Sequence, residues 1–148
     1  MNESGSRAAE MVPYDLPDSP YERLLLYAIR RMAVGGLTDA FAAQAMIGGF
    51  GVDFRRPLVL LRAFMGEVAR VAETRLVVAP CCCGRMTRHE RILIEGIGRA
   101  VDDPVGAHRA LAGATGLATC LGLLTSAQAV ATSFADLGMP LGPMGLER

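Results

Sequence analysis

The sequence predicts an all-α fold, a compact bundle of five or six helices with a cysteine-rich loop before one capped helix. Apolar residues recur every three or four positions through most of the chain, which is the period of a helix with one buried face. Residues typical of helix starts and stops flank these runs. The one run rich in β-branched residues, Leu76-Val77-Val78, is too short to form a sheet alone, and we expect an extended connector there.

Length and composition indicate one domain. The chain has 148 residues, of which 51% are hydrophobic, enough to bury a core without disulfides. Prolines and acidic residues near the N-terminus discourage regular structure there. We therefore expect a flexible arm over residues 1–18, a single helical domain over 19–141 and a flexible tail over 142–148.

Two helices are predicted in the first third of the chain. Ser19-Pro20 supplies an N-cap and a first-turn proline, and Gly35-Gly36 supplies a stop, so the first helix lies between them. A second, shorter helix is expected to begin at Thr38-Asp39 and to stop at the glycines of residues 48–51. Its inward residues are expected to be Phe41, Ala45 and Met46.

A third helix is expected from near Pro57 to about Thr74. Its apolar residues follow the helical spacing, and Glu67 and Arg70 can form an ion pair on its solvent-exposed face. The expected buried stripe consists of Leu58, Leu61, Met65, Val68 and Ala72.

The next helix start is the clearest local signal in the chain. Thr87-x-x-Glu90 has the pattern of a capping box, in which two side chains satisfy each other's free backbone N–H groups. The apolar residues that follow predict a buried stripe, and Arg91, Glu95 and Arg99 are expected to pair along an exposed flank. The predicted stripe consists of Ile92, Leu93, Ile97 and Ala100.

Two further helices are expected before the C-terminus, one from Pro104 to about Ala112 and one from Leu117 or Ser126 to Leu137. Residues 110–134 carry no charge, but their glycines and hydroxyl groups make them too weakly apolar for a membrane span. We therefore expect buried helices, which could also contact a second copy of the chain.

The balance of positive and negative charge limits the classes of partner that the chain is expected to bind. Fifteen basic residues, all of them arginine, balance fifteen acidic ones, so no long-range attraction for nucleic acid is expected. The N-terminus has no apolar signal core, and a cytoplasmic protein with neither a nucleic-acid nor a membrane partner is expected. The low charge and small helical core favour a homodimer.

Three consecutive cysteines, Cys81-Cys82-Cys83, are the most distinctive feature of the sequence. Neighbouring cysteines make a poor disulfide framework, which leaves three interpretations. The thiols bind a thiophilic metal such as zinc, they take part in redox chemistry, or they are buried as small apolar groups. The fourth cysteine, Cys120, is expected to be a packing residue.

For a metal site, Cys81 and Cys83 can converge on one ion while Cys82 points away. His89, on the first turn of the capped helix, is the nearest further candidate ligand, and His108 or Cys120 would have to be brought in by the fold. For redox chemistry, Arg85 and Arg88 would add positive charge and so favour the reactive thiolate.

The segment from Pro80 to Glu90, together with residues 124–138, is similar to segments of an uncharacterised family of small alphaproteobacterial proteins. That family's motif reads Pro-x-Cys-Cys-x-Arg-Met-Thr-x-x-Glu, and the resemblance covers about residues 19–141. The resemblance implies that Cys82 and Cys83 are the shared cysteines, with Arg85, and that Cys81 is an addition of this chain. It implies no reaction, substrate or cofactor.

The sequence therefore leads to two hypotheses. In the first, a non-enzymatic regulatory or binding protein uses Cys81, Cys82 and Cys83, with His89 and the supporting Arg85 and Arg88, for redox sensing or soft-metal binding. In the second, the chain is a structural or protein-interaction module with its cysteines buried. An enzyme is disfavoured, since no nucleophile, base and anion-holding donor share a motif.

Overall fold

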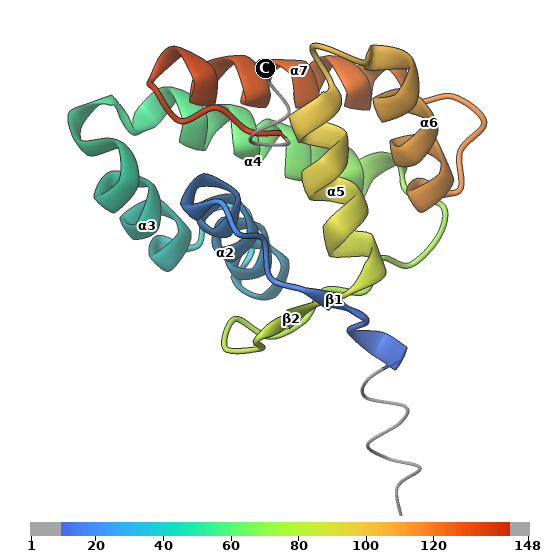
Figure 1. Cartoon of the computed structure of the whole chain (residues 1–148), viewed down its shortest axis with the longest axis horizontal. Coiled ribbons are helices and arrows are strands. Elements are labelled where there is room, and N and C mark those ends of the chain that lie inside the picture. Colours follow the sequence, from blue (N-terminus) through green and yellow to red (C-terminus); the bar gives the residue numbers. More distant parts are fainter. Residues whose placement is uncertain (1–9, 143–148) are drawn as a thin grey trace, which may run out of the picture.

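The computed structural model describes residues 10–142 and confirms the all-α prediction (Figure 1). The remaining parts of the expected arm and tail, residues 1–9 and 143–148, lie outside the described residues. In chain order the described elements are β1 (Tyr14–Asp15), α2 (Pro20–Gly35), α3 (Ala40–Phe50), the 3-10 turn η1 (Gly51–Asp53), α4 (Arg55–Val71), β2 (Arg85–Met86), α5 (Arg88–Arg99), α6 (Pro104–Thr115) and α7 (Leu121–Asp136).

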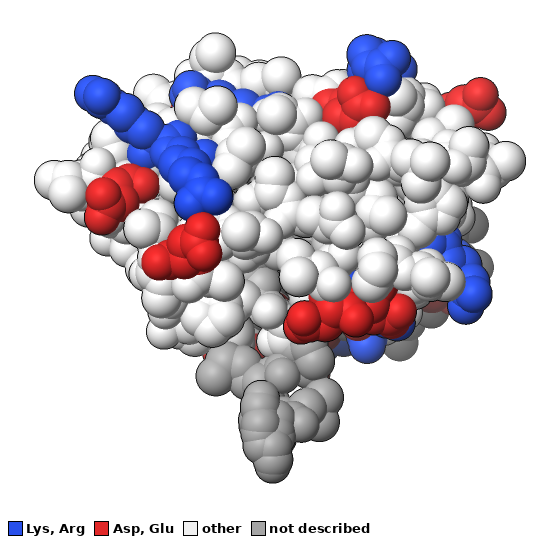
Figure 2. All heavy atoms as spheres, turned by 90° about the horizontal axis from the view of Figure 1, so that it is seen from above, with Lys and Arg blue, Asp and Glu red and all other residues white. Residues whose placement is uncertain are grey.

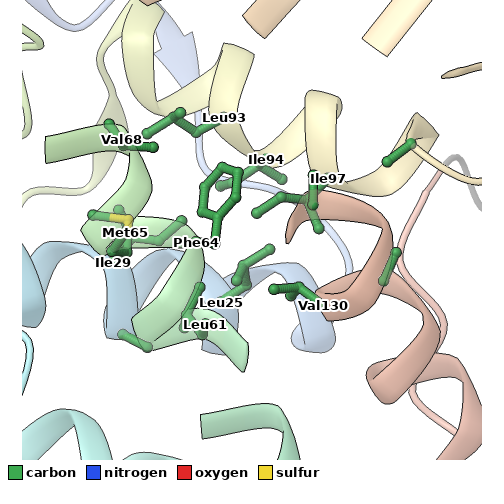
Figure 3. Packing of buried hydrophobic residues seen from close by; sticks show 14 of the residues in the cluster. Leu25, Ile29, Leu61, Phe64, Met65, Val68, Leu93, Ile94, Ile97 and Val130 are labelled. Atoms are coloured by element: carbon green, nitrogen blue, oxygen red, sulfur yellow. The ribbon is translucent and has the colours of Figure 1, made fainter. Parts of the chain in front are cut away.

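The core forms where α2, α4, α5 and α7 meet. Phe64 of α4 is fully buried at its centre, with α2 on one side and α5 on the other (Figure 3). Helix α7 packs along α4, and α6 packs on α5, while α3 packs on α2. The fully buried apolar side chains around Phe64 include Leu25, Ile29, Leu61, Leu93, Ile97 and Val130.

Three of the predicted helix starts are confirmed by their side-chain caps. The Ser19 hydroxyl accepts hydrogen bonds from the N–H groups of Tyr21 and Glu22, and Asp39 accepts one from Ala42 N–H at 3.0 Å. Thr87 and Glu90 form the reciprocal capping box. Each cap satisfies backbone donors that the first turn of a helix leaves without partners.

The predicted orientation of α3 is confirmed for Met46, which is fully buried, but not for Phe41. Phe41, expected inside, has 55% of its surface exposed and lies over the Arg31 guanidinium, 4.6 Å from the ring centroid. The buried residues of α3 are Ala42, Met46 and Phe50, so Ala42 and Phe50 take the inward positions expected of Phe41 and Ala45.

Helix α3 ends within the glycine-rich segment where a stop is predicted, at Gly51 and not at Gly48 or Gly49. Gly48 and Gly49 are helical, and a Cβ on Gly49 would lie 2.5 Å from Leu24 Cδ2, so this glycine permits close packing on α2. The helix ends at Gly51, whose φ of 63° favours glycine.

The C-terminal helices differ in detail from their predicted bounds. Helix α6 continues to Thr115 and ends at Gly116, whose φ is 76°. Helix α7 begins at Leu121, between the two predicted starts. Arg91 pairs with Glu95 as expected, whereas Arg99 pairs with Asp103. None of the described helices combines the length and the hydropathy of a membrane span.

A small antiparallel sheet was not anticipated. Tyr14 is paired with Met86 and Asp15 with Arg85, so part of the expected arm lies against the segment after the cysteines. The Arg85 guanidinium donates to the carbonyl oxygens of Val12 and Pro13 and pairs with the Asp15 carboxylate at 2.7 Å. The Arg85 guanidinium therefore binds the N-terminal segment at three of its residues.

Candidate functional site

The three adjacent cysteines lie on a tight turn between α4 and α5. The Cys83 N–H donates to the Pro80 carbonyl oxygen at 3.0 Å, which closes a β-turn with Cys81 and Cys82 at its two central positions. The Cys82 side chain is exposed, and those of Cys81 and Cys83 are half-buried. We call residues 80–83 the thiol turn. The thiol turn therefore differs from the arrangement in which all three cysteines are buried, because the Cys82 side chain is exposed.

A buried ion pair lies directly beneath the thiol turn. Arg30 of α2 and Glu90 of α5 are 3% and 0% exposed, and they form a bidentate pair. Nε of Arg30 donates to Oε2 of Glu90 at 2.7 Å, and Nη2 donates to Oε1 at 3.0 Å. Planar, two-point contact of this kind fixes the relative orientation of both side chains.

The same ion pair holds the backbone on both sides of the turn. Arg30 donates to the carbonyl oxygens of Cys83 at 2.8 Å and Arg85 at 2.7 Å. Glu90 accepts from the N–H groups of Ala79 at 3.0 Å and Thr87 at 2.8 Å. Because four backbone groups of residues 79–87 bind this one pair, the thiol turn has a fixed backbone despite its exposed position.

Sequence reasoning missed Arg30 and assigned Glu90 only its capping role. A signal existed for Arg30, which follows Leu26 by four residues and lies between Ile29 and Met32, all three of them buried. A cation on the apolar stripe of a helix indicates a buried partner. The identity of that partner, sixty residues away, could not be inferred from helical spacing.

The positive charge nearest to the thiols comes from Arg31. Its Nη1 lies 3.8 Å from Cys81 Sγ, while Nε and Nη2 bind the Asp39 carboxylate at 3.1 and 2.9 Å. Asp39, and to a lesser extent Cys81, raise the pKa of Arg31 further above its usual range. The hydrogen bonds from Arg31 lower the pKa of Asp39. Both groups are therefore charged at neutral pH.

The two arginines predicted to support the thiols have other positions. Arg85 is directed at Val12, Pro13 and Asp15, and Arg88 is exposed on the first turn of α5. Sequence proximity suggested these residues, whereas the fold brings Arg31 to Cys81 from α2, fifty residues away.

The predicted third metal ligand is engaged elsewhere. His89 Nδ1 accepts a hydrogen bond from Val77 N–H at 2.8 Å, so the proton of a neutral imidazole lies on Nε2, which then has no lone pair for a metal. Within residues 10–142, no three His, Cys, Asp or Glu side chains are grouped as metal ligands would be. The structure thus does not bring Cys81, Cys83 and His89 together for zinc.

The fourth cysteine belongs to a separate structural cap. Cys120 is 7% exposed, and its N–H donates to His108 Nε2 at 3.0 Å where α7 begins. Burial raises the pKa of the Cys120 thiol, which keeps it in the less reactive neutral form. This placement agrees with the predicted packing role of Cys120.

An open hollow of about 860 Å³ adjoins the thiol turn. It lies between the second half of α2 and residues 75–82, and Cys81 and Cys82 form part of its wall. Its volume is in the range of small-molecule sites in proteins. The two thiols at the centre of the turn can therefore meet a ligand held in this hollow.

Comparison with known proteins gives one match. A family model described as "Family of unknown function (DUF6628)" matches residues 4–139, almost the whole chain. No curated protein and no solved structure matches the chain significantly.

Proposed function

The chain belongs to the DUF6628 family, and we propose that it is a small, non-enzymatic regulatory protein whose thiol turn senses oxidants. The observation that carries this proposal is the position of Cys81. Its sulfur lies 3.8 Å from the Arg31 guanidinium, at the wall of an open hollow and on a fixed turn. The Arg31 N–H directed at this sulfur places a hydrogen-bond donor and a positive charge beside the atom that would react.

The chemistry proposed is oxidation by a hydroperoxide. The Cys81 thiolate attacks the terminal peroxide oxygen, an S–O bond forms as the O–O bond breaks, and the alkoxide or hydroxide leaves and takes up a proton. A second thiol then attacks the sulfenic sulfur, forming a disulfide and releasing water. The half-buried Cys83 is the candidate within the chain, and the exposed Cys82 is the candidate for a bridge to another molecule.

Oxidation is preferred over soft-metal binding because of the ligand arrangement. The Val77 N–H occupies the His89 nitrogen that would otherwise fix the ring for metal binding through Nε2. Thiol oxidation needs no such third ligand.

The adjoining sheet provides a route for a response. Arg85 and Met86, which form β2, follow the thiol turn directly and pair with Tyr14 and Asp15 of β1. A disulfide in the turn would displace the carbonyl groups that Arg30 now binds, and so would loosen β2. We therefore propose that oxidation is reported by release of the N-terminal segment.

The test is oxidation of the reduced full-length protein by hydrogen peroxide, followed by mass spectrometry. We expect loss of two thiols of the turn as a disulfide, and an oxidation rate lowered at least about tenfold by Cys81→Ser. Cys120→Ser is the matched control, because the same atom is exchanged at a buried site. The proposal fails if no thiol is lost, or if both substitutions slow the reaction equally.

One face of the molecule favours a second candidate function. In this function the chain is a helical interaction module that forms a homodimer. Figure 2 shows a broad uncharged surface, on the side where α6 and α7 lie in Figure 1. Asp136 and Arg109 are the only charged residues of these two helices, and Leu121 of α7 is 66% exposed. A face of this composition suits a second copy of the chain better than it suits nucleic acid.

For this candidate we expect the wild type to sediment as a dimer at micromolar concentration. Thr132→Arg places a charge on the exposed side of α7 and should give a monomer, because burying an unpaired charge opposes association. Val34→Arg introduces the same group on α2, at an exposed position away from α7, and should leave the dimer intact. A monomeric wild type in sedimentation velocity would exclude the dimer.

A further inference from the structure

The charged residues that line the 860 Å³ hollow beside the thiol turn are all arginines. They are Arg30, Arg31 and Arg75, and no carboxylate belongs to the described lining. Most of the remaining wall is apolar, with Val34 on α2 facing the residues from Leu76 to Pro80. A concave apolar wall with a few cations suits a ligand that has an apolar body and a negative head.

The three arginines differ in what they can offer to such a ligand. Arg30 is 3% exposed and its donors are occupied by Glu90 and two carbonyl groups. Arg31 uses Nε and Nη2 on Asp39, which offsets part of its charge, but its Nη1 is directed at Cys81. Arg75 is exposed, and within residues 10–142 its guanidinium makes no hydrogen bond. The available donors are therefore the second N–H of Arg31 Nη1 and the whole guanidinium of Arg75.

We propose that this hollow binds an amphipathic monocarboxylate, an organic acid with an extended hydrocarbon body. The carboxylate is held at Arg31 and Arg75, and the hydrocarbon lies along Val34, Leu76 and Val78. No aromatic side chain is part of the described lining, which disfavours a nucleotide, whose base would need a stacking surface. This inference does not require that any thiol is oxidised, and so it goes beyond the sensing role.

The probe is decanoate, titrated calorimetrically into the reduced full-length protein below its critical micelle concentration. We expect saturable binding that Arg75→Gln weakens about tenfold, since a charge-assisted hydrogen bond is lost. Arg109→Gln, the same change at an exposed arginine of α6, should leave the affinity unchanged. Decan-1-ol, which has the same chain without the charge, should bind at least about tenfold more weakly. Unchanged thermal melting of both variants verifies that they are folded.

A second readout uses the thiols in the wall. Bound decanoate should slow alkylation of Cys81 and Cys82 by the neutral reagent iodoacetamide, and should leave Cys120 unaffected. The Cys83→Ser variant removes the second thiol of the proposed disulfide at a position outside the described lining of the hollow, and should bind decanoate as the wild type does, which separates this site from the redox proposal. Three results would overturn the inference: no saturable binding, equal affinity for decanoate and decan-1-ol, or binding that appears only after residues 1–9 are deleted. The last result would assign the hollow to that segment.

Discussion

Replacing Arg30 by Met is expected to lower the free energy of unfolding by about 3–5 kcal/mol. The substitution keeps an unbranched apolar stem but leaves the Glu90 carboxylate, 0% exposed, without its cation. A buried charge stripped of its partner is among the most destabilising single changes known. Urea unfolding followed by circular dichroism at pH 7 measures the difference.

The matched control is Arg91→Met. Arg91 pairs with Glu95 on the surface of α5 at 2.9 Å, with both side chains nearly half exposed. Solvent screens such a pair, so the loss should be less than about 1 kcal/mol. If Arg30→Met costs no more than Arg91→Met, then the buried pair does not have the role described for it.

The same substitution should also loosen the thiol turn. Arg30→Met removes the donors bound to the Cys83 and Arg85 carbonyl groups, while Glu90 keeps its own bonds to the N–H groups of Ala79 and Thr87. Hydrogen exchange at the amides of β2 is therefore expected to rise more than exchange at Ala79. A uniform rise across the chain would indicate global destabilisation instead.

Local signals predicted most of the fold because they involve residues three or four positions apart. The Thr87–Glu90 capping box and the Ser19 cap depend only on neighbours in sequence, and both are present as expected. The position of the cysteines in a loop before a capped helix was likewise fixed by Pro80, Gly84 and Thr87. Such features need no knowledge of tertiary packing.

The candidate site could be predicted only in part, because its key contacts join distant segments. Arg30 and Glu90 are sixty residues apart, and Arg31 reaches Cys81 across fifty. Sequence proximity suggested Arg85 and Arg88 instead, but side chains near a thiol in sequence need not point at it. The pairing of Tyr14 with Met86 was missed for the same reason.

The two phenylalanines Phe64 and Phe41 show what periodicity can and cannot decide. Phe64 lies outside the predicted buried stripe of its helix, yet it is fully buried, because the apolar face of α4 is wider than that stripe. The sequence predicts that Phe41 is buried. In α3, however, nearly every residue is apolar, and no charged residue marks the solvent-exposed face. Without such contrast, the sequence cannot fix the rotation of a helix about its axis.

Phe64→Ala is therefore expected to cost about 3–5 kcal/mol of unfolding free energy, the range for removing a buried aromatic ring and leaving a cavity. Phe41→Ala removes the same atoms at a position that is 55% exposed, and loses mainly the contact with the Arg31 guanidinium. About 0.5–1 kcal/mol is expected there. Paired urea unfolding curves give both values. Equal losses of unfolding free energy would mean that Phe41 is buried, as the sequence alone predicts. The Arg31 guanidinium would then lack the aromatic ring that supports its orientation toward Cys81.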